Sequence, residues 1–259
     1  IWCLYNMTES EDYNCYFNGR KEIEDDITTI LNNFETQCEN INYKKGIYVY
    51  GSPGSGKTFL ITKILKKLNY DIIKYDAGDI RNKNLIETIT SNNISNKNVL
   101  NMMTKKITKI AIVMDEIDGM NSGDKGGINA LIKLIRQKKT KKQKTEGKTM
   151  NPIICIGNYY TDKKMRELMK VCNVFELPSP QDNEIIKILK KNCKNQKLKI
   201  SVFKMMVKYI QGDMRKLNFA IRVVSTLDGK GDESKLLNIF QKKSFNEDSK
   251  SITNQLYKI

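Results

Sequence analysis

The chain has 259 residues, of which 39% are hydrophobic and 29% are charged. This length allows one large domain or two smaller ones with their own cores, and the composition excludes a disordered chain. No apolar run approaches the roughly 18 residues that a membrane-spanning helix needs, so the sequence predicts a soluble protein with no membrane partner.

The charge is strongly basic, with 45 Lys and Arg against 29 Asp and Glu, and a net charge of +16. Such a charge favours an anionic partner such as a nucleic acid. Most of the basic residues are Lys, and Lys, Asn and Ile are all abundant, as an AT-rich genome would encode. The charge alone therefore leaves two interpretations open, nucleic-acid binding and a codon bias without function.

The chain contains six cysteines and no histidine. No two cysteines form a C-x-x-C pair, whereas zinc sites need such ligands at short spacing. We therefore expect no metal–cysteine site, and we expect most of the cysteines to be small buried residues in a reducing compartment.

Short apolar runs alternate with helical patterns between about residues 46 and 178. The runs are rich in Ile, Val or Tyr and are bounded by turn residues, which is typical of a parallel sheet covered by helices on both faces. The predicted strands are Ile47–Tyr50, Asp71–Tyr75, Ile110–Met114, Pro152–Ile156 and Val174–Leu177. The predicted helices between them include Lys57–Leu68, Ile128–Gln137 and Lys163–Lys170.

The segment Leu177-Pro178-Ser179-Pro180 ends this pattern, because proline cannot continue a helix and restricts the residue before it. Amphipathic helices are predicted after it, at Glu184–Lys191, Val202–Ile210 and Met214–Leu227. The predicted organisation is an α/β domain, a small helical domain and a polar tail, at residues 1–178, 179–228 and 229–259. The tail includes one short apolar helix near Leu236–Phe240.

Residues 51–58, with the sequence GSPGSGKT, match the phosphate-binding pattern G-x-x-x-x-G-K-[ST] between a predicted strand and a predicted helix. The glycines allow backbone N–H groups to turn toward phosphates, and the start of the helix presents its positive end to the same anion. Lys57 is expected to neutralise the β and γ phosphates and Thr58 to ligate Mg²⁺. The sequence thus predicts ATP and Mg²⁺ as cofactors, with nucleotide contacts from Ser52, Pro53, Gly54, Ser55, Gly56, Lys57 and Thr58.

A buried strand ends in two acidic residues, Asp115 and Glu116. We expect Asp115 to hold Mg²⁺ and Glu116 to act as the general base for an attacking water. Asn158 follows a later strand and would orient that water, and Arg215 opens the last predicted helix and would reach the γ-phosphate. Each of the last two has a structural alternative, an ordinary turn residue for Asn158 and an exposed helix start capped by Asp213 for Arg215.

The order of these motifs, with helices after the sheet, resembles the AAA+ ATPases and, within them, the large subunit of replication-factor-C clamp loaders. The resemblance covers about residues 45–227. It is carried by YDAGDIR at 75–81, MDEIDGM at 114–120, DKGGI at 124–128, PIICIGN at 152–158 and GDMR at 212–215.

The resemblance implies a P-loop AAA+ fold, in which a parallel five-stranded sheet flanked by helices is followed by a small all-helical lid domain. It implies an ATP-dependent subunit of a hetero-oligomeric pentamer that opens a ring-shaped sliding clamp and loads it on primer–template DNA. Such a protein is intracellular, in a eukaryotic nucleus or at the cytoplasmic replication site of a large DNA virus. The polar tail would correspond to the start of a collar domain.

Small clamp-loader subunits carry a Ser-Arg-Cys motif whose arginine reaches the neighbouring ATP site, whereas this chain has Lys170-Val171-Cys172. Large subunits likewise lack that arginine. The resemblance therefore implies an ATPase that is weak alone and receives an arginine finger from a neighbour, which accelerates hydrolysis by about 10³–10⁵.

The resemblance also implies contacts with DNA phosphates that do not depend on base sequence. The candidate residues lie on or just after one predicted helix, and they are Lys133, Arg136, Lys138 and Lys139. Their alternative is a solvated helix face. The basic stretch 138–148 (KKTKKQKTEGK) is a predicted surface loop that either contacts phosphates or is a solvated insertion.

Two other functions fit a P-loop of this kind. One is an AAA+ replication ATPase of the origin-binding or branch-migration type, and the other is a non-hydrolysing, ATP-gated scaffold. The stretch 115–127, which resembles clamp loaders, argues against the first. The presence of Glu116 argues against the second, because inactive sites often lose that carboxylate.

Overall fold

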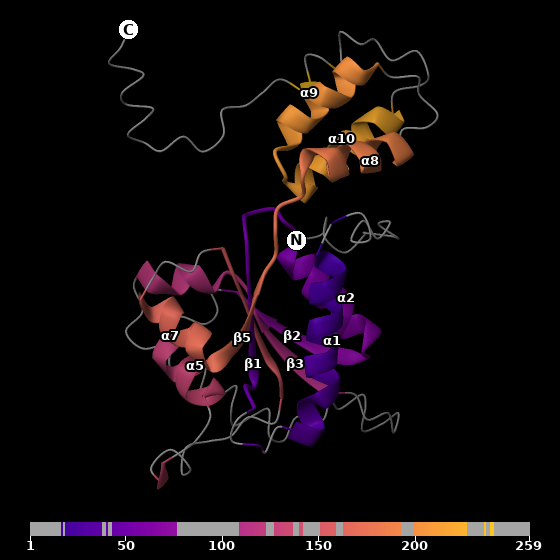
Figure 1. Cartoon of the computed structure of the whole chain (residues 1–259). Coiled ribbons are helices and arrows are strands. Elements are labelled where there is room, and N and C mark those ends of the chain that lie inside the picture. The colour runs from indigo at the N-terminus through magenta and orange to yellow at the C-terminus, as the bar shows by residue number, and fades with distance from the viewer. Residues whose placement is uncertain are drawn as a thin grey trace, which may run out of the picture. The chain divides into compact units, whose positions relative to one another are not determined.

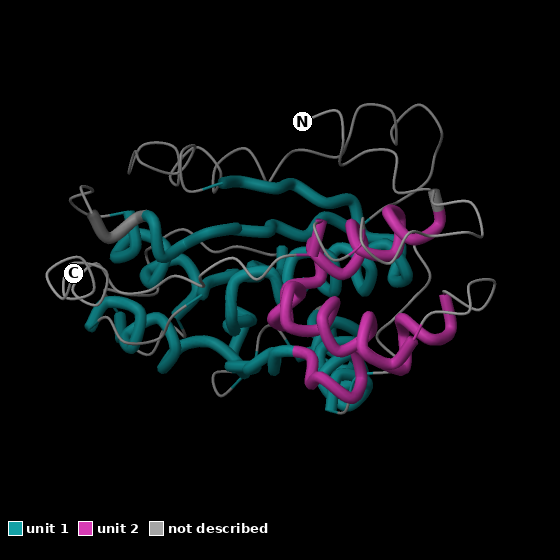
Figure 2. Tube along the Cα trace, turned by 90° about the horizontal axis from the view of Figure 1, so that it is seen from above, with its two compact units in different colours: residues 1–179 teal, residues 180–259 magenta. Residues whose placement is uncertain are grey.

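The structure, a computed structural model, falls into two compact units, residues 1–179 and 180–259 (Figure 2). It describes residues 17, 19–37, 40, 43–76, 109–122, 127–136, 140–141, 151–158, 163–192, 199–226, 236 and 239–240. Among these residues, no helix combines the length and the apolar character that crossing a membrane requires.

The first unit is built on a parallel five-stranded sheet with the strand order β2-β3-β4-β1-β5 (Figure 1). The strands are β1 (Gly46–Tyr50), β2 (Tyr70–Tyr75), β3 (Lys109–Met114), β4 (Ile153–Gly157) and β5 (Cys172–Glu176). Each strand overlaps one of the apolar runs in the sequence, so the predicted parallel five-stranded sheet is confirmed.

Helices cover both faces of the sheet (Figure 1). Helices α1 (Arg20–Gln37) and α2 (Lys57–Lys67) lie on one face, and α5 (Gly127–Ile135) and α7 (Lys163–Val171) on the other. Successive strand side chains point to opposite faces. In β1, for example, Tyr48 packs with α5 and α7, while Val49 packs with α1 and α2. Since both faces of the three inner strands are buried, β1, β3 and β4 consist almost entirely of apolar residues, which explains their uninterrupted runs.

Helix α1 was not predicted from the sequence. Most of its residues are polar, and its apolar stripe is narrow, with Ile23, Ile27, Leu31 and Phe34 at helical spacing. The last three of these side chains are buried, and the helix packs on α2. Such a narrow apolar stripe does not identify a helix in the sequence, and its role becomes clear only from the α2 and sheet residues that pack against it.

Two cysteines contribute to the core of the first unit. Cys155 in β4 and Cys172 in β5 are buried free thiols, as expected, and the other four cysteines lie outside the described residues or have no described side chain. Burial raises the pKa of both thiols, that of Cys172 to about 12. Both therefore stay protonated and act as small apolar side chains.

The second unit contains the three helices predicted from the sequence, α8 (Asp182–Asn192), α9 (Ile200–Ile210) and α10 (Met214–Thr226). They bury apolar side chains such as Ile188, Met206 and Leu217 against one another. Phe240, from the predicted short helix of the tail, is also buried, and its ring lies 5.4 Å from that of Tyr209. The second unit is therefore all-helical over its described residues.

Gly46 offers a test of how tightly this sheet is packed. A Cβ atom at this position would lie 2.6 Å from Ile135 Cγ2 and 2.7 Å from Cys172 Sγ. Overpacking of this kind costs about 1–3 kcal/mol, so Gly46→Ala should lower the free energy of unfolding by that amount in urea denaturation. Val174→Thr, at a partly exposed position of the edge strand β5, should change it by less than about 0.5 kcal/mol. Equal stability of the two variants would contradict the packing described.

Candidate functional site

The loops that follow β1, β3 and β4 begin next to one another, at the carboxyl ends of these parallel strands. Tyr50 at the end of β1 pairs with Gly157 of β4, and Met114 at the end of β3 pairs with Cys155 of the same strand. Because all three strands are parallel, the residues that follow them leave the sheet on the same side. The chain leaves β1 toward α2 on one face and β4 toward α7 on the other. Such a point, where the direction of connection switches, is where α/β sheets bind ligands.

The loop after β1 has a backbone suited to phosphates. Gly54 and Gly56 have left-handed φ angles of 77° and 91°, which glycine adopts without steric cost. Gly56 is the N-cap of α2 and provides no side-chain cap, so the first N–H groups of the helix can face an anion. Ser55 Oγ is buried, and no partner for it exists among the described residues. These features fit a triphosphate held by the loop.

Lys57 joins this loop to the end of β4. Its Nζ donates to Gly51 O, Ser52 O and Asn158 Oδ1, each at 2.9 Å. The side chain is buried, and three acceptors match the three donors of an ammonium group. The predicted P-loop lysine and the predicted Asn158 are therefore in direct contact, although 101 residues separate them in the sequence.

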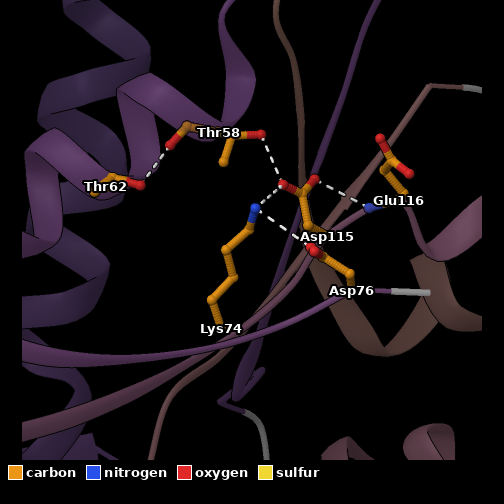
Figure 3. A network of polar contacts seen from close by, with 6 residues as sticks. All are labelled: Thr58, Thr62, Lys74, Asp76, Asp115 and Glu116. Carbon is orange, nitrogen blue, oxygen red and sulfur yellow. Dashed lines mark hydrogen bonds and ion pairs between the residues drawn. The ribbon is translucent and has the colours of Figure 1, made fainter. Parts of the chain in front are cut away.

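Asp115 is the centre of a second polar cluster (Figure 3). Its Oδ2 accepts a hydrogen bond from Thr58 Oγ1 at 3.0 Å, and its Oδ1 accepts one from the Glu116 N–H at 3.0 Å. The Thr58 carbonyl in turn accepts a hydrogen bond from Thr62 Oγ1 at 2.7 Å. The structure thus brings together Thr58 and Asp115, the two residues that the sequence assigns to Mg²⁺.

The donor set of this cluster fits Mg²⁺. A hydroxyl and a carboxylate are hard oxygen ligands, which this ion prefers. Within the described residues, His, Cys, Asp and Glu side chains form no group of three or more that could hold a metal by itself. Mg²⁺ is commonly bound by one or two protein groups together with substrate phosphates, and two oxygen groups such as those of Thr58 and Asp115 fit that pattern.

Glu116 has a left-handed backbone, with φ at 52°. This conformation is uncommon for residues other than glycine and occurs preferentially at functional sites. The Glu116 side chain is exposed, and Figure 3 shows its carboxylate directed away from Lys74. The backbone turn therefore separates the two adjacent carboxylates, so that only Asp115 takes part in the polar cluster.

Lys74, at the end of β2, belongs to this cluster and was missed in the sequence. Its Nζ lies 3.0 Å from Asp115 Oδ2 and 3.3 Å from Asp76 Oδ1. Burial lowers the pKa of Lys74, but the hydrogen bonds and the charges of Asp115 and Asp76 together raise it by more, so the net shift is upward. Only the pairing of β2 with β3 makes Lys74 a neighbour of Asp115, and no local pattern predicts that pairing.

Asp118, in the 3-10 helix η4 (Ile117–Ser122), positions Asn158 and was also missed as a site residue. Its Oδ2 accepts a hydrogen bond from the Asn158 N–H at 2.6 Å. A Cβ on Gly157 would overlap Asp118 Oδ1 and lie 2.5 Å from the Tyr48 hydroxyl, so glycine is needed for this approach. The signal was present, because Asp118 stands inside the MDEIDGM stretch on which the resemblance rests.

Arg20, the first residue of α1, contacts the phosphate loop, and it is the third site residue that was not predicted from the sequence. Its guanidinium is buried, with Nη2 donating to Ser55 O at 2.9 Å and to Pro178 O at 3.1 Å. The hydroxyl groups of Ser52 and Ser179 make a further contact at 2.6 Å. The phosphate loop is therefore attached to the segment that follows β5.

The other predicted residues belong to other elements of the described chain or fall outside the described residues. Arg215 is exposed in the first turn of α10 in the second unit, and its N–H donates to Asp213 Oδ1 at 2.8 Å, which fits the capping interpretation of Asp213. On α5 of the first unit, Lys133 is exposed, and Arg136 follows the end of that helix. Lys138 and Lys139 are outside the described residues.

Comparisons with known proteins agree with this geometry. Residues 47–177, about half of the chain, match the family described as "ATPase family associated with various cellular activities (AAA)". The replication factor C large subunit of Methanococcus aeolicus is 28% identical over 188 residues, which are 71% of this chain and 36% of that protein. Replication factor C subunit 1 of Saccharomyces cerevisiae is 30% identical over 187 residues, which are 69% of this chain and 20% of that protein.

The chain thus spans only about a fifth to a third of the length of these two relatives. Among solved structures, a chain of the E. coli MS115-1 HORMA:CdnC:Trip13 complex has the same fold, with a TM-score of 0.60 and 14% sequence identity. That match covers 90% of this chain and 91% of the other. From the family match, the parallel sheet and the P-loop at its edge, we conclude that this chain belongs to the AAA family of ATPases and resembles replication factor C large subunits.

Proposed function

We propose that this chain is the ATP-binding and ATP-hydrolysing part of a clamp-loader large subunit, which opens a ring-shaped sliding clamp and loads it on primer–template DNA. The main support is the pair of contacts across the P-loop, from Lys57 to Asn158 and from Thr58 to Asp115. The names of the relatives favour a clamp loader over the other AAA+ ATPases considered above.

ATP would bind with its phosphates on the loop 52–58. Lys57 would exchange contacts with the Gly51 and Ser52 carbonyls for contacts with the β and γ phosphate oxygens, and the backbone N–H groups after Gly54 would donate to the same anion. Thr58 and Asp115 would hold Mg²⁺, which screens the charge of the triphosphate when bound. Arg215 is proposed to contact the γ-phosphate from the helical lid.

Glu116 is the proposed general base. Its exposed carboxylate is kept out of the Asp115 cluster and can accept a proton from the attacking water. Asn158, fixed through its N–H by Asp118, would orient that water with its side-chain amide. Hydrolysis would then depend on Glu116 and Asn158, which follow the carboxyl ends of β3 and β4.

Assembly with neighbouring subunits would complete the site. No arginine stands at Lys170-Val171-Cys172, where small clamp-loader subunits carry their finger, and Cys172 is buried at the start of β5. We infer that this chain receives a finger from a neighbour and donates none here. The partners proposed are four smaller ATPase subunits, the sliding clamp and DNA, whose phosphates Lys133 and Arg136 would contact together with Lys138 and Lys139.

Lys57→Ala should abolish measurable ATP binding. Loss of several charge-assisted hydrogen bonds to phosphate should raise the Kd for a fluorescent ATP analogue by about 100-fold or more. The matched control is Lys63→Ala, which removes a lysine of the same helix that is paired with Glu24 at 3.2 Å. Retained affinity in Lys57→Ala would refute the role of the loop.

Glu116→Gln should separate binding from hydrolysis. Glutamine keeps the shape of the side chain but cannot accept the proton, so turnover should fall by about 10²–10⁴ while ATP stays bound. Turnover is best measured with clamp-loader partner subunits present, because a missing finger would itself limit the rate. Glu22→Gln, at an exposed position of α1, is the control. Unchanged turnover in Glu116→Gln would remove Glu116 from the chemistry.

Binding to primer–template DNA should weaken steeply with salt. Each phosphate contacted contributes about −0.9 to the slope of log K against log salt. Lys133→Ala should therefore make the slope shallower by about that amount, whereas Lys204→Ala, at an exposed position of α9, should leave it unchanged. A flat salt response of the unmodified chain would discard DNA binding through phosphates.

A further inference from the structure

Lys74 holds a position that the proposed function does not explain. Its ammonium group lies 3.0 Å from Asp115 Oδ2, the same carboxylate oxygen that accepts the hydrogen bond from Thr58 (Figure 3). That oxygen is therefore shared between a hydroxyl group and a fixed positive charge. It is also one of the two protein oxygens suited to Mg²⁺.

The backbone brings Lys74 to this place. Lys74 is paired in register with Val113, and Val113 lies two residues before Asp115. The Asp115 side chain is 10% exposed and that of Lys74 is 45% exposed, so the lysine reaches the buried carboxylate from the solvent side. The contact thus links a partly exposed cation to a carboxylate that has little access to water.

Asp76 gives Lys74 a second partner. The two charged groups are 3.3 Å apart, and the Asp76 side chain is 61% exposed. If Lys74 moved away from Asp115, it could keep an ion pair with Asp76 at the surface. The ammonium group would then stay paired, and the only one of these two contacts that it gives up is the one with Asp115.

A lysine ammonium and a divalent cation cannot both lie against one carboxylate oxygen, because like charges at this distance repel each other strongly. We propose that Lys74 is an internal cation that competes with Mg²⁺ for Asp115 and so sets the concentration of Mg²⁺ at which the site binds nucleotide. This inference rests on the proposed ATP site. Before the ion binds, Lys74 balances the charge of Asp115 and so reduces the repulsion between that carboxylate and a triphosphate.

Binding of a fluorescent ATP analogue to the full chain, titrated with Mg²⁺ and repeated in EDTA, tests this role. In Lys74→Met the half-saturating Mg²⁺ concentration should fall by about fivefold, because the ion no longer displaces an ion pair. Affinity in EDTA should also fall, by about fivefold, because Asp115 is then uncompensated. Lys74→Arg should keep the Mg²⁺ response of the unmodified chain.

A second variant should shift the response in the opposite direction. In Asp76→Asn, Lys74 loses its alternative partner and stays on Asp115, so the half-saturating Mg²⁺ concentration should rise. Lys63→Met, which removes the ion pair with Glu24 in the same unit, controls for the loss of a partly buried lysine and should leave the response unchanged. Asp76→Asn also tests the proposal if Lys74→Met fails to fold.

The outcomes separate this inference from the proposed function. Loss of all nucleotide binding by the unmodified chain in Mg²⁺ would overturn the ATP site itself. With binding intact, an unchanged Mg²⁺ response in both Lys74→Met and Asp76→Asn would overturn the competition alone. Weaker binding of Lys74→Met in saturating Mg²⁺ would overturn it too, because it would make Lys74 a phosphate ligand.

Discussion

The parallel pairing of β4 with β1 on one side and β3 on the other is the constraint on which this molecule depends. It brings Gly51, Asp115 and Asn158 to one edge of the sheet, and it divides the strand side chains between two cores. A shift of one residue would turn each side chain of a strand to the opposite face. The same shift would also separate Lys57 from Asn158. Stability of the first unit and integrity of the site therefore rest on the same strand register.

The site satisfies its own charges within the protein. The ammonium group of Lys57 has three oxygen acceptors, and the carboxylate of Asp115 has donors on both oxygens. Such internal contacts hold the side chains in place, which reduces the entropy lost on binding. A nucleotide must nevertheless replace some of them, so part of its binding energy goes into exchanging partners. The affinity for nucleotide and its dependence on Mg²⁺ are thus set by the protein groups that contact Lys57 and Asp115 as well as by the phosphate loop.

Local patterns in the sequence predicted the strands, most of the helices and the phosphate loop, because apolar runs and the G-x-x-x-x-G-K-[ST] pattern depend only on nearby residues. They did not predict α1, whose apolar stripe is too narrow to stand out. They also missed Arg20, Lys74 and Asp118. Each of these contacts a residue that is distant in the sequence, and the packing that brings the partners together has no local signal, although Asp118 stands inside a stretch that carries the resemblance.

The two hydrogen bonds that Arg20 donates, to the carbonyls of Ser55 and Pro178, have a consequence for where this domain begins and ends. The family match runs from residue 47 to residue 177, so it starts after Arg20 and stops one residue before Pro178. A shortened protein cut to those limits would retain every nucleotide-binding motif of the first unit. It would nevertheless lack the Arg20 guanidinium and the Pro178 carbonyl. Its phosphate loop would therefore lose the hydrogen bond from Arg20 to the Ser55 carbonyl. The physical boundary of the ATP-binding unit therefore lies at least as far back as the start of α1.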